Sequence, residues 1–327
     1  MIHLTSLQLK LLRDLWRLRA QALAIAAVAM CGIASLVTMR GAYEALRVAQ
    51  HTYYQQYRFA DVFAHLRRAP IGITEAIRRI EGVSNVQARV VVDAPLDVPG
   101  LEEPATGRLV SLTPANQNNL NRVYLREGRL PEPGNRHEIL ISEAFAGANA
   151  LQAGAVLEAV INGRRENLQV TGIGLSPEYI NEMRGSGFPD YRRFGVLWMD
   201  QEALSGLLGM REGCNDIVLT LSPNASEAEV IRLLDNLLEP FGGLGAIGRE
   251  DQLSHQFISN ELVQTSVSAT VIPAIFLSVA AFLVHNVLLR LSSMQRMQIG
   301  LLKSFGYSHG AIASHYMQFA LLTVAVG

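Results

Sequence analysis

Two long stretches of the chain carry no charged side chain. The first extends from Ala20 to Met39, and the second extends from Leu262 to Leu289. At about 1.5 Å of rise per residue, a helix of the first length matches the ~30 Å hydrocarbon core of a bilayer, so residues 20–39 are predicted to form transmembrane helix 1. The second stretch is longer than the core requires and begins with polar residues. We therefore expect residues 263–289 to form a stalk followed by transmembrane helix 2.

Two further segments have the pattern of membrane-associated helices. Residues 310–327 are uncharged and are interpreted as the start of transmembrane helix 3, with the sequence truncated within that helix. Ahead of helix 1, leucines spaced three and four apart predict a cytoplasmic interfacial amphipathic helix in residues 1–19. A buried helix of a soluble protein would show the same leucine stripe. A cleaved signal peptide fits less well, because its apolar region is usually only ~7–15 residues long.

Charge is distributed unevenly, although 28 basic and 29 acidic residues give the whole chain a net charge of only −1. Residues 1–39 carry four basic residues and one acid, and residues 263–327 carry three basic residues and no acid. Basic flanks of membrane helices favour the cytoplasm, so residues 1–19 and 290–309 are placed there and residues 40–262 outside. The chain is predicted to be a multi-pass protein of the cell inner (cytoplasmic) membrane with its N-terminus in the cytoplasm. No nucleic acid is expected as a partner, because the chain is not basic overall.

The external block has the pattern of mixed strands and short helices. Apolar segments predict strands at residues 60–66 and 86–92 with a helix between them, which makes one βαβ unit. A second unit starts with a strand at residues 216–222, and its helix is expected to begin with a capping box of Ser226 and Glu229. Further strands include a hairpin joined at Asn162-Gly163, a pair that favours a type I′ turn.

The predicted fold class is a membrane protein with α-helical transmembrane segments and a large extracytoplasmic α+β domain. Two βαβ units are expected to pack together and to carry a β-rich insertion at about residues 95–200. The external block contains a single cysteine, Cys214, so it cannot form an internal disulfide.

The sequence lacks the common motifs of catalysis and metal binding. It has no phosphate-binding loop and no HExxH, CxxC or GxSxG pattern, and its eight histidines show no metal-like pairing. An extracytoplasmic enzyme tethered by a helix would need such a set. We therefore predict no catalytic residue, metal or cofactor site in this chain.

Residues 290–309 form the most informative segment on the cytoplasmic side. Apolar residues at helical spacing, cations at Arg296 and Lys303, and Gly306 as a C-terminal cap predict a short amphipathic helix. Ser308 is placed to cap the next helix. The helix could rest on lipid headgroups or dock into a groove on a cytoplasmic partner, and the residues by themselves leave both alternatives open.

This segment resembles the signature of FtsX-like ABC transporter permeases, the superfamily that includes MacB, LolC and LolE. Gln298 stands where the family commonly has an acid. Four external segments are also similar to the MacB-like periplasmic core domain, namely residues 128–131, 138–142, 170–173 and 176–180. The residues that match the signature are Arg296, Ile299, Gly300, Leu302, Lys303, Gly306 and Ser308.

The resemblance implies a permease subunit that contacts a cytoplasmic ABC ATPase subunit, which would bind ATP and magnesium. The implied activity is export or extraction of a lipid, lipoprotein, peptide or drug. A second permease copy or second repeat, a periplasmic adaptor and the lipid bilayer are the other expected partners. The alternative function is a membrane-anchored extracytoplasmic sensor or binding protein. The residues implied in ATPase coupling are Arg296, Gln298, Ile299, Gly300, Lys303 and Gly306.

Overall fold

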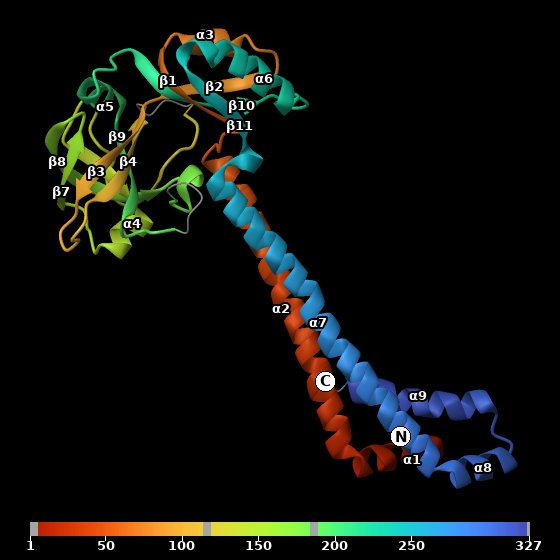
Figure 1. The fold of residues 1–327 in the computed structure, drawn as a ribbon. Helices are drawn as coiled ribbons and strands as arrows, with labels where there is room; N and C mark the ends of the chain where they lie inside the picture. The colour runs from red at the N-terminus through yellow and green to blue at the C-terminus, as the bar shows by residue number, and fades with distance from the viewer. Residues whose placement is uncertain (1–5, 114–118, 184–188, 326–327) are drawn as a thin grey trace. The chain divides into compact units, whose positions relative to one another are not determined.

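The chain divides into two compact units. A computed structural model describes residues 6–113, 119–183 and 189–325. One unit, called here the helical unit, comprises Met1–Val48 and Glu261–Gly327, and the other, called the sheet unit, comprises Ala49–Asn260. Figure 1 labels most of the helices and strands of both units.

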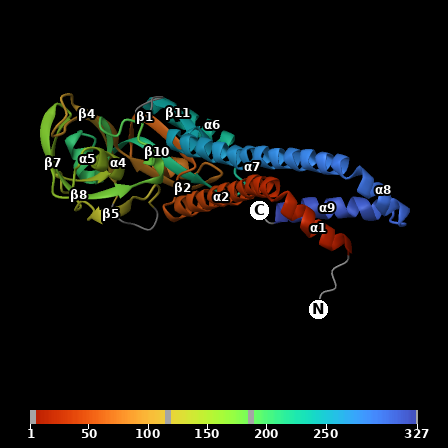
Figure 2. The ribbon, with the colours of Figure 1, turned by 90° about the horizontal axis from the view of Figure 1, so that it is seen from below.

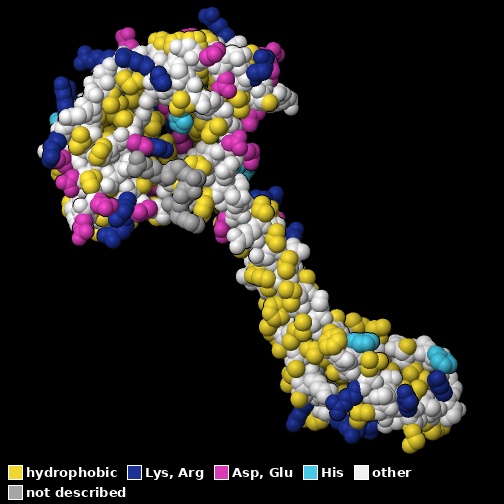
Figure 3. Space-filling model, viewed as in Figure 1, with side chains coloured by type: hydrophobic (Ala, Val, Ile, Leu, Met, Phe, Trp, Pro, Cys, Tyr) yellow, Lys and Arg dark blue, Asp and Glu magenta, His cyan; other side chains and the backbone are white. Residues whose placement is uncertain are grey.

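The helical unit contains the two helices that are long and apolar enough to cross a bilayer, α2 and α7, among the residues that the structure describes. Both leave large apolar side chains exposed along much of their length, as a lipid-facing helix does, and Figure 3 shows these side chains on one face. The helices that contribute to this unit are α1 (Ser6–Arg17), α2 (Arg19–Gln56), α7 (Leu253–Met294), α8 (Arg296–Ser304) and α9 (His309–Ala325).

Helix α2 is longer than the predicted transmembrane segment and extends to Gln56. The predicted membrane span ends at Met39 because charge begins at Arg40. Charge ends a membrane-spanning segment but does not end a helix, and no proline follows within α2 to break it. Helix α7 is continuous as well, with Pro273 inside it.

Helices α2 and α7 pack closely at Gly32 (Figures 1 and 2). A Cβ atom at this position would lie 3.1 Å from Phe276 Cβ and 3.2 Å from the Leu277 side chain. Such contacts are tight, so the glycine lets the two backbones approach within the apolar part of the pair.

The sheet unit contains a four-stranded antiparallel sheet, sheet A, in the order β11-β1-β10-β2. Strands β1 and β2 both run antiparallel to β10, which lies between them, so the predicted first βαβ unit has strands that are parallel but not neighbours. The second unit, β10-α6-β11, is split in the same way by β1. The elements are β1 (Val62–Pro70), α3 (Ile73–Arg78), β2 (Val83–Arg89), β10 (Gly213–Leu221), α6 (Glu227–Leu238) and β11 (Gly243–Gly248).

The two faces of sheet A bury different residues. Alternate residues of β1 and β10 pack against α3 and α6, including Ala64 and Ile217. Their chain neighbours Phe63 and Val218 point to the other face, where Tyr54 and Phe59 cover them. Successive side chains of a strand point to opposite faces of the sheet. Helices α3 and α6 therefore cover one face of sheet A, and the end of α2 covers the other.

Seven further strands form sheet B, in the order β5-β8-β6-β9-β4-β3-β7. Strand β7 also pairs with β8, so the sheet closes into a barrel with β5 attached outside. Asn162 and Gly163 both have positive φ between β7 and β8, which confirms the predicted hairpin turn. The elements are β3 (Val91–Asp97), β4 (Ala105–Leu112), β5 (Tyr124–Gly128), β6 (Glu138–Ser142), α4 (Glu143–Ala148), β7 (Val156–Ile161), β8 (Arg164–Leu175), β9 (Phe194–Asp200) and α5 (Gln201–Leu207), with 3₁₀ turns η1 (Pro177–Tyr179), η2 (Glu239–Phe241) and η3 (Arg249–Asp251).

Two local predictions were wrong. The expected strand at residues 86–92 is two strands, because the chain leaves sheet A after Arg89 and enters sheet B at Val91. The expected capping box does not form, since the side chain of Ser226 makes no capping hydrogen bond and Glu229 pairs with Arg232 instead.

A buried ionic cluster joins the two sheets. Arg89, at the end of β2, donates from Nη1 and Nη2 to both carboxylate oxygens of Glu178 at 2.5 and 2.9 Å. Its Nε donates to Asp216 Oδ1 at 2.7 Å. His65 Nδ1 lies 2.6 Å from the other oxygen of Asp216, and its side chain is 53% exposed. One buried cation therefore faces two buried anions, and a protonated His65 makes the cluster neutral.

Arg89→Met is expected to destabilise the sheet unit by about 3–5 kcal/mol, because it leaves Glu178 and Asp216 buried without their cation. Urea unfolding of the full chain in micelles measures this, with Trp198 as the only reporter in a Trp16→Phe background. Arg232→Met is the control, since its pair with Glu229 is exposed and screened by solvent, so little loss of stability is expected. Equal losses of unfolding free energy in the two variants would show that the buried cluster stabilises the fold no more than an exposed ion pair does.

The pKa of His65 is raised, chiefly by its hydrogen bond to Asp216. A raised folded-state pKa means that protonated His65 stabilises the fold fully below its unfolded pKa of about 6.5, and that this contribution disappears as pH rises through the folded-state pKa. His65→Gln should therefore be less stable than the parent at about pH 6 and equal to it at about pH 9. Urea midpoints at the two pH values measure this, and a pH-independent difference would contradict it.

Candidate functional site

The segment that the sequence singled out is a separate short helix, α8. Gln295 has non-helical backbone angles, φ −101° and ψ 19°, and interrupts the helix between α7 and α8. At the other end Tyr307 N donates to Leu302 O and Gly306 N donates to Lys303 O, with Gly306 at φ +90°. This pair of bonds is a Schellman motif, so the predicted glycine cap is confirmed.

The next helix starts as predicted. Ser308 Oγ accepts a hydrogen bond from Ala311 N at 3.2 Å, which caps α9. Helix α8 therefore has a defined end on each side. It is a separate helix and does not continue α7 or α9.

One face of α8 exposes large apolar side chains. Met297 is 90% exposed, Phe305 73% and Leu301 58%. Their spacing places them on one side of the helix, and nothing in the described chain covers them. An exposed apolar stripe of this kind marks a contact with lipid or with a partner.

The six residues implied in ATPase coupling all lie on or next to α8. Arg296, Gln298, Gly300, Lys303 and Gly306 are exposed, and Ile299 is half-buried. By helix geometry Gly300 lies between the edge that carries Arg296 and Lys303 and the apolar stripe. A Cβ atom on Gly300 would meet no atom within 4 Å. Their coupling role stays a prediction.

A polar cluster ties the break before α8 to the rest of the helical unit. Lys10 Nζ donates to Asp14 Oδ2 at 2.7 Å and to Gln295 Oε1 at 2.6 Å. Gln295 Nε2 donates to Asp14 at 3.1 Å, and Tyr316 OH donates to Gln295 Oε1 at 2.9 Å. The residue at the break is thereby bonded to both α1 and α9, which restricts how α8 can turn.

Sequence reasoning missed this cluster. Lys10 and Asp14 lie in residues 1–19, which the sequence predicts only as an amphipathic helix. Their spacing of four is the local signal of an ion pair, but nothing in the sequence pointed to Gln295, which is 285 residues from Lys10.

Within the sheet unit, the ends of α2 and α7 are joined to each other and to both sheets. Tyr54 OH lies 3.1 Å from His255 Nδ1, and Ser259 Oγ lies 3.1 Å from His255 Nε2. Gln252 Nε2 donates to Glu178 O at 2.7 Å, next to the ionic cluster. Arg249 donates to the carbonyls of Phe59 and Ala60. The ends of both long helices are thus fixed to the residues before β1 of sheet A and to the turn after β8 of sheet B.

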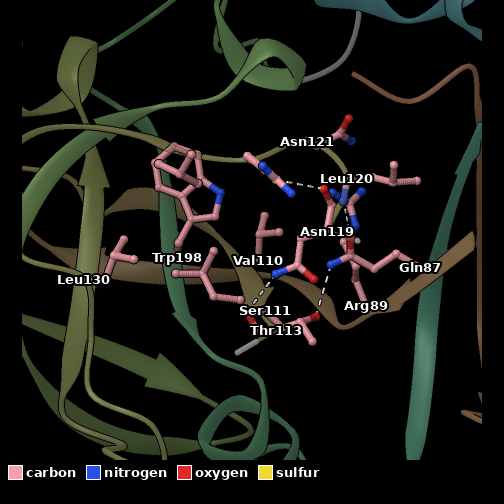
Figure 4. Close-up of a pocket in the computed structure, with 13 residues that line it drawn as sticks. Gln87, Arg89, Val110, Ser111, Thr113, Asn119, Leu120, Asn121, Leu130 and Trp198 are labelled. Carbon is pink, nitrogen blue, oxygen red and sulfur yellow. Dashed lines mark hydrogen bonds between the residues drawn. The ribbon is translucent and has the colours of Figure 1, made fainter. Parts of the chain in front are cut away.

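A cavity of about 420 Å³ lies between sheet A and the outside of the barrel (Figure 4). Its apolar wall includes Val110 and Trp198, and its polar wall includes Gln87 and Arg89. Gln87 donates to Thr113 Oγ1 at 3.1 Å and accepts from Leu120 N at 2.7 Å.

Two polar residues of the cavity wall are already bonded within the chain. Arg89 is engaged in the ionic cluster and the Gln87 amide already bonds to the chain on both sides. Among the described residues, no group of histidine, cysteine and acidic side chains could hold a metal ion.

Comparison with known proteins gives similarities to solved structures. No family model and no curated protein matches the chain. The extracellular domain of the noncanonic ABC-type transporter YknZ from Gram-positive bacteria is 14% identical, with a TM-score of 0.37 over 58% of this chain and 99% of that domain. The periplasmic region of MacB from Actinobacillus actinomycetemcomitans is 10% identical, with a TM-score of 0.38 over 64% of this chain and 95% of that region. The first of these structures is an extracellular domain of a transporter, and the second is a periplasmic region.

Proposed function

We propose that this chain is the permease subunit of an ABC transporter that works with a separate ATPase subunit. Helices α2 and α7 cross the membrane, α9 begins a further span, and the sheet unit lies outside. The N-terminus and α8 lie in the cytoplasm, where α8 docks on the ATPase. Movement of α8 passes along α7 to the sheet unit, which handles a lipid, lipoprotein, peptide or drug outside the bilayer.

The observation that carries this proposal is the uncovered apolar stripe on α8. Burial of Met297, Leu301 and Phe305 would each contribute about 1.5–3 kcal/mol to a complex. The stripe is presented on a helix that is capped at its C-terminus and tied to α1 and α9 through Gln295. A preorganised apolar face of this kind, beside the cations Arg296 and Lys303, supports docking on a protein partner.

A second candidate function is a membrane-anchored extracytoplasmic binding protein or sensor. The cavity beside Trp198 favours it, because about 420 Å³ falls in the size range of ligand sites. This function does not require a partner on α8, so tests of α8 separate the two candidates.

Gly300→Leu is expected to weaken docking of α8 by roughly five- to 150-fold. Its side chain meets open space within the chain, so a clash arises only against a partner, and overpacking costs about 1–3 kcal/mol. A photo-crosslinking amino acid in place of Met297, in cells of the source organism, measures docking as the yield of an adduct with a polypeptide that carries a phosphate-binding loop.

Gly147→Leu is the matched control, because Gly147 lies in helix α4 and also has open space around it. It should leave the adduct yield unchanged. Gly306 is a less clean position, since its φ of +90° makes any side chain strained even without a partner. An undiminished adduct in Gly300→Leu would count against the docking of α8.

Membrane orientation is testable by cysteine labelling in a Cys31→Ala background. Burial raises the pKa of Cys214 to about 11, and the thiol is fully buried, so it should not react. Ala150→Cys should react with an impermeant maleimide in intact cells, and Lys303→Cys only after permeabilisation. The reverse pattern would overturn the orientation and with it the transporter proposal.

A further inference from the structure

A second cavity of about 310 Å³ lies in the helical unit, between the α1–α2 bend and the α7–α8 break. Arg13 and Arg17 of α1 and Arg290 of α7 all line it. Gln298 of α8, at the family position that commonly carries an acid, lines it too. The cavity therefore brings cations from two ends of the sequence to one place.

The three guanidinium groups form no hydrogen bond or ion pair with one another or with any other described side chain. Asp14 is the single acid in the cavity wall, and its charge is already matched by Lys10 at 2.7 Å. The described wall thus carries three positive charges without a counter-ion from the chain. Like charges held around one space repel, so an anion in that space is favoured.

A polar atom in the same wall also lacks a partner. Gln21 Oε1 is buried and accepts no hydrogen bond from the described residues. A buried carbonyl oxygen without a donor costs about 1–3 kcal/mol. A hydrogen-bond donor such as a hydroxyl would satisfy this oxygen, and an anion would be attracted to the three exposed arginines.

The remaining wall is apolar. Val287 and Leu291 of α7 line the cavity beside the arginines. The cavity thus lies at the end of the apolar, exposed helix pair formed by α2 and α7 (Figure 3), where Lys and Arg side chains gather. An occupant that is anionic at one end and apolar at the other fits this boundary.

We propose that this cavity binds the headgroup of an anionic phospholipid of the cytoplasmic leaflet, with the phosphodiester between Arg13, Arg17 and Arg290 and a headgroup hydroxyl donating to Gln21. Guanidinium groups bind phosphate oxygens in bidentate pairs, which three arginines can surround. The acyl chains then lie along the apolar faces of α2 and α7. The inference depends on the membrane placement proposed above but not on an ATPase partner.

Binding to the full chain in zwitterionic detergent micelles tests the site by native mass spectrometry. Phosphatidylglycerol, which has a phosphodiester and hydroxyl groups, is expected to bind at least about tenfold more tightly than phosphatidylcholine. Inorganic phosphate and glycerol 3-phosphate should compete weakly, since they lack acyl chains. Competition by either at the affinity of the lipid would overturn the proposal in favour of a soluble anion.

The triple variant Arg13→Gln, Arg17→Gln, Arg290→Gln should lose at least about tenfold in phosphatidylglycerol affinity. Arg40→Gln, Arg79→Gln, Arg164→Gln removes the same charge at exposed positions outside the cavity and should leave the affinity unchanged. Equal losses in the two variants would indicate general charge attraction and overturn the site. The triple lysine variant at 13, 17 and 290 keeps the charge but not the bidentate geometry, so an intermediate affinity is expected.

Further outcomes distinguish lipid binding from occupation of the cavity by a protein segment and from the docking of α8. If an acidic protein segment of the ATPase occupies the cavity instead, phosphatidylglycerol will show no preference over phosphatidylcholine in the purified chain, and the proposal fails. Loss of the Met297 adduct in Gly300→Leu with unchanged lipid binding is the result expected if both proposals hold. An unaffected adduct with specific lipid binding would overturn the coupling role alone.

Discussion

The fold of the sheet unit depends on one buried arginine. Arg89 is the last residue of β2, and after Val90 the chain enters the barrel, so its side chain lies where the two sheets meet. It pairs with Asp216 in sheet A and with Glu178 in the turn after β8. A buried charge is costly unless it is paired, so a movement that separates Glu178 from Arg89 leaves a buried carboxylate without its cation. The two sheets are therefore held in one arrangement. Gln252 at the start of α7 bonds to Glu178 O, which connects that arrangement to a long helix.

In the helical unit, a smaller polar cluster around Gln295 likewise joins residues that are far apart in the sequence. Gln295 sits where α7 stops being helical, a position that would otherwise allow α8 to swing freely. Its amide bonds to Lys10, Asp14 and Tyr316, so α1 and α9 determine its place. The apolar stripe on α8 is consequently presented by a supported helix rather than by a mobile loop. Preorganisation of this kind reduces the conformational entropy that a helix loses on docking.

Features that depend only on residues close together in the chain could be predicted from the sequence. The apolar stretches predicted α2 and α7, Asn162-Gly163 predicted its turn, and Gly306 predicted the end of α8, because each follows from local hydrophobicity or backbone conformation. The end of α2 at Gln56 was missed, since charge rather than helix propensity was used to place it. The split order of the strands in sheet A and the pairs of Arg89 and Gln295 could not be found this way. They join residues far apart in the sequence, and no local pattern records which distant partner a side chain will meet.

One set of arginines can have two roles, membrane orientation and anion binding. The set is Arg13, Arg17 and Arg290. In the sequence they count only as positive charges that favour the cytoplasmic side of a membrane helix. That role needs charge near the membrane but not any particular position. The structure places all three around one cavity, together with a buried and unpaired amide oxygen of Gln21. An orientation signal gains nothing from this convergence, because gathering like charges raises their repulsion. Their convergence is better explained by an anion held between them, and at this boundary of α2 and α7 the anion with a matching apolar part is a phospholipid.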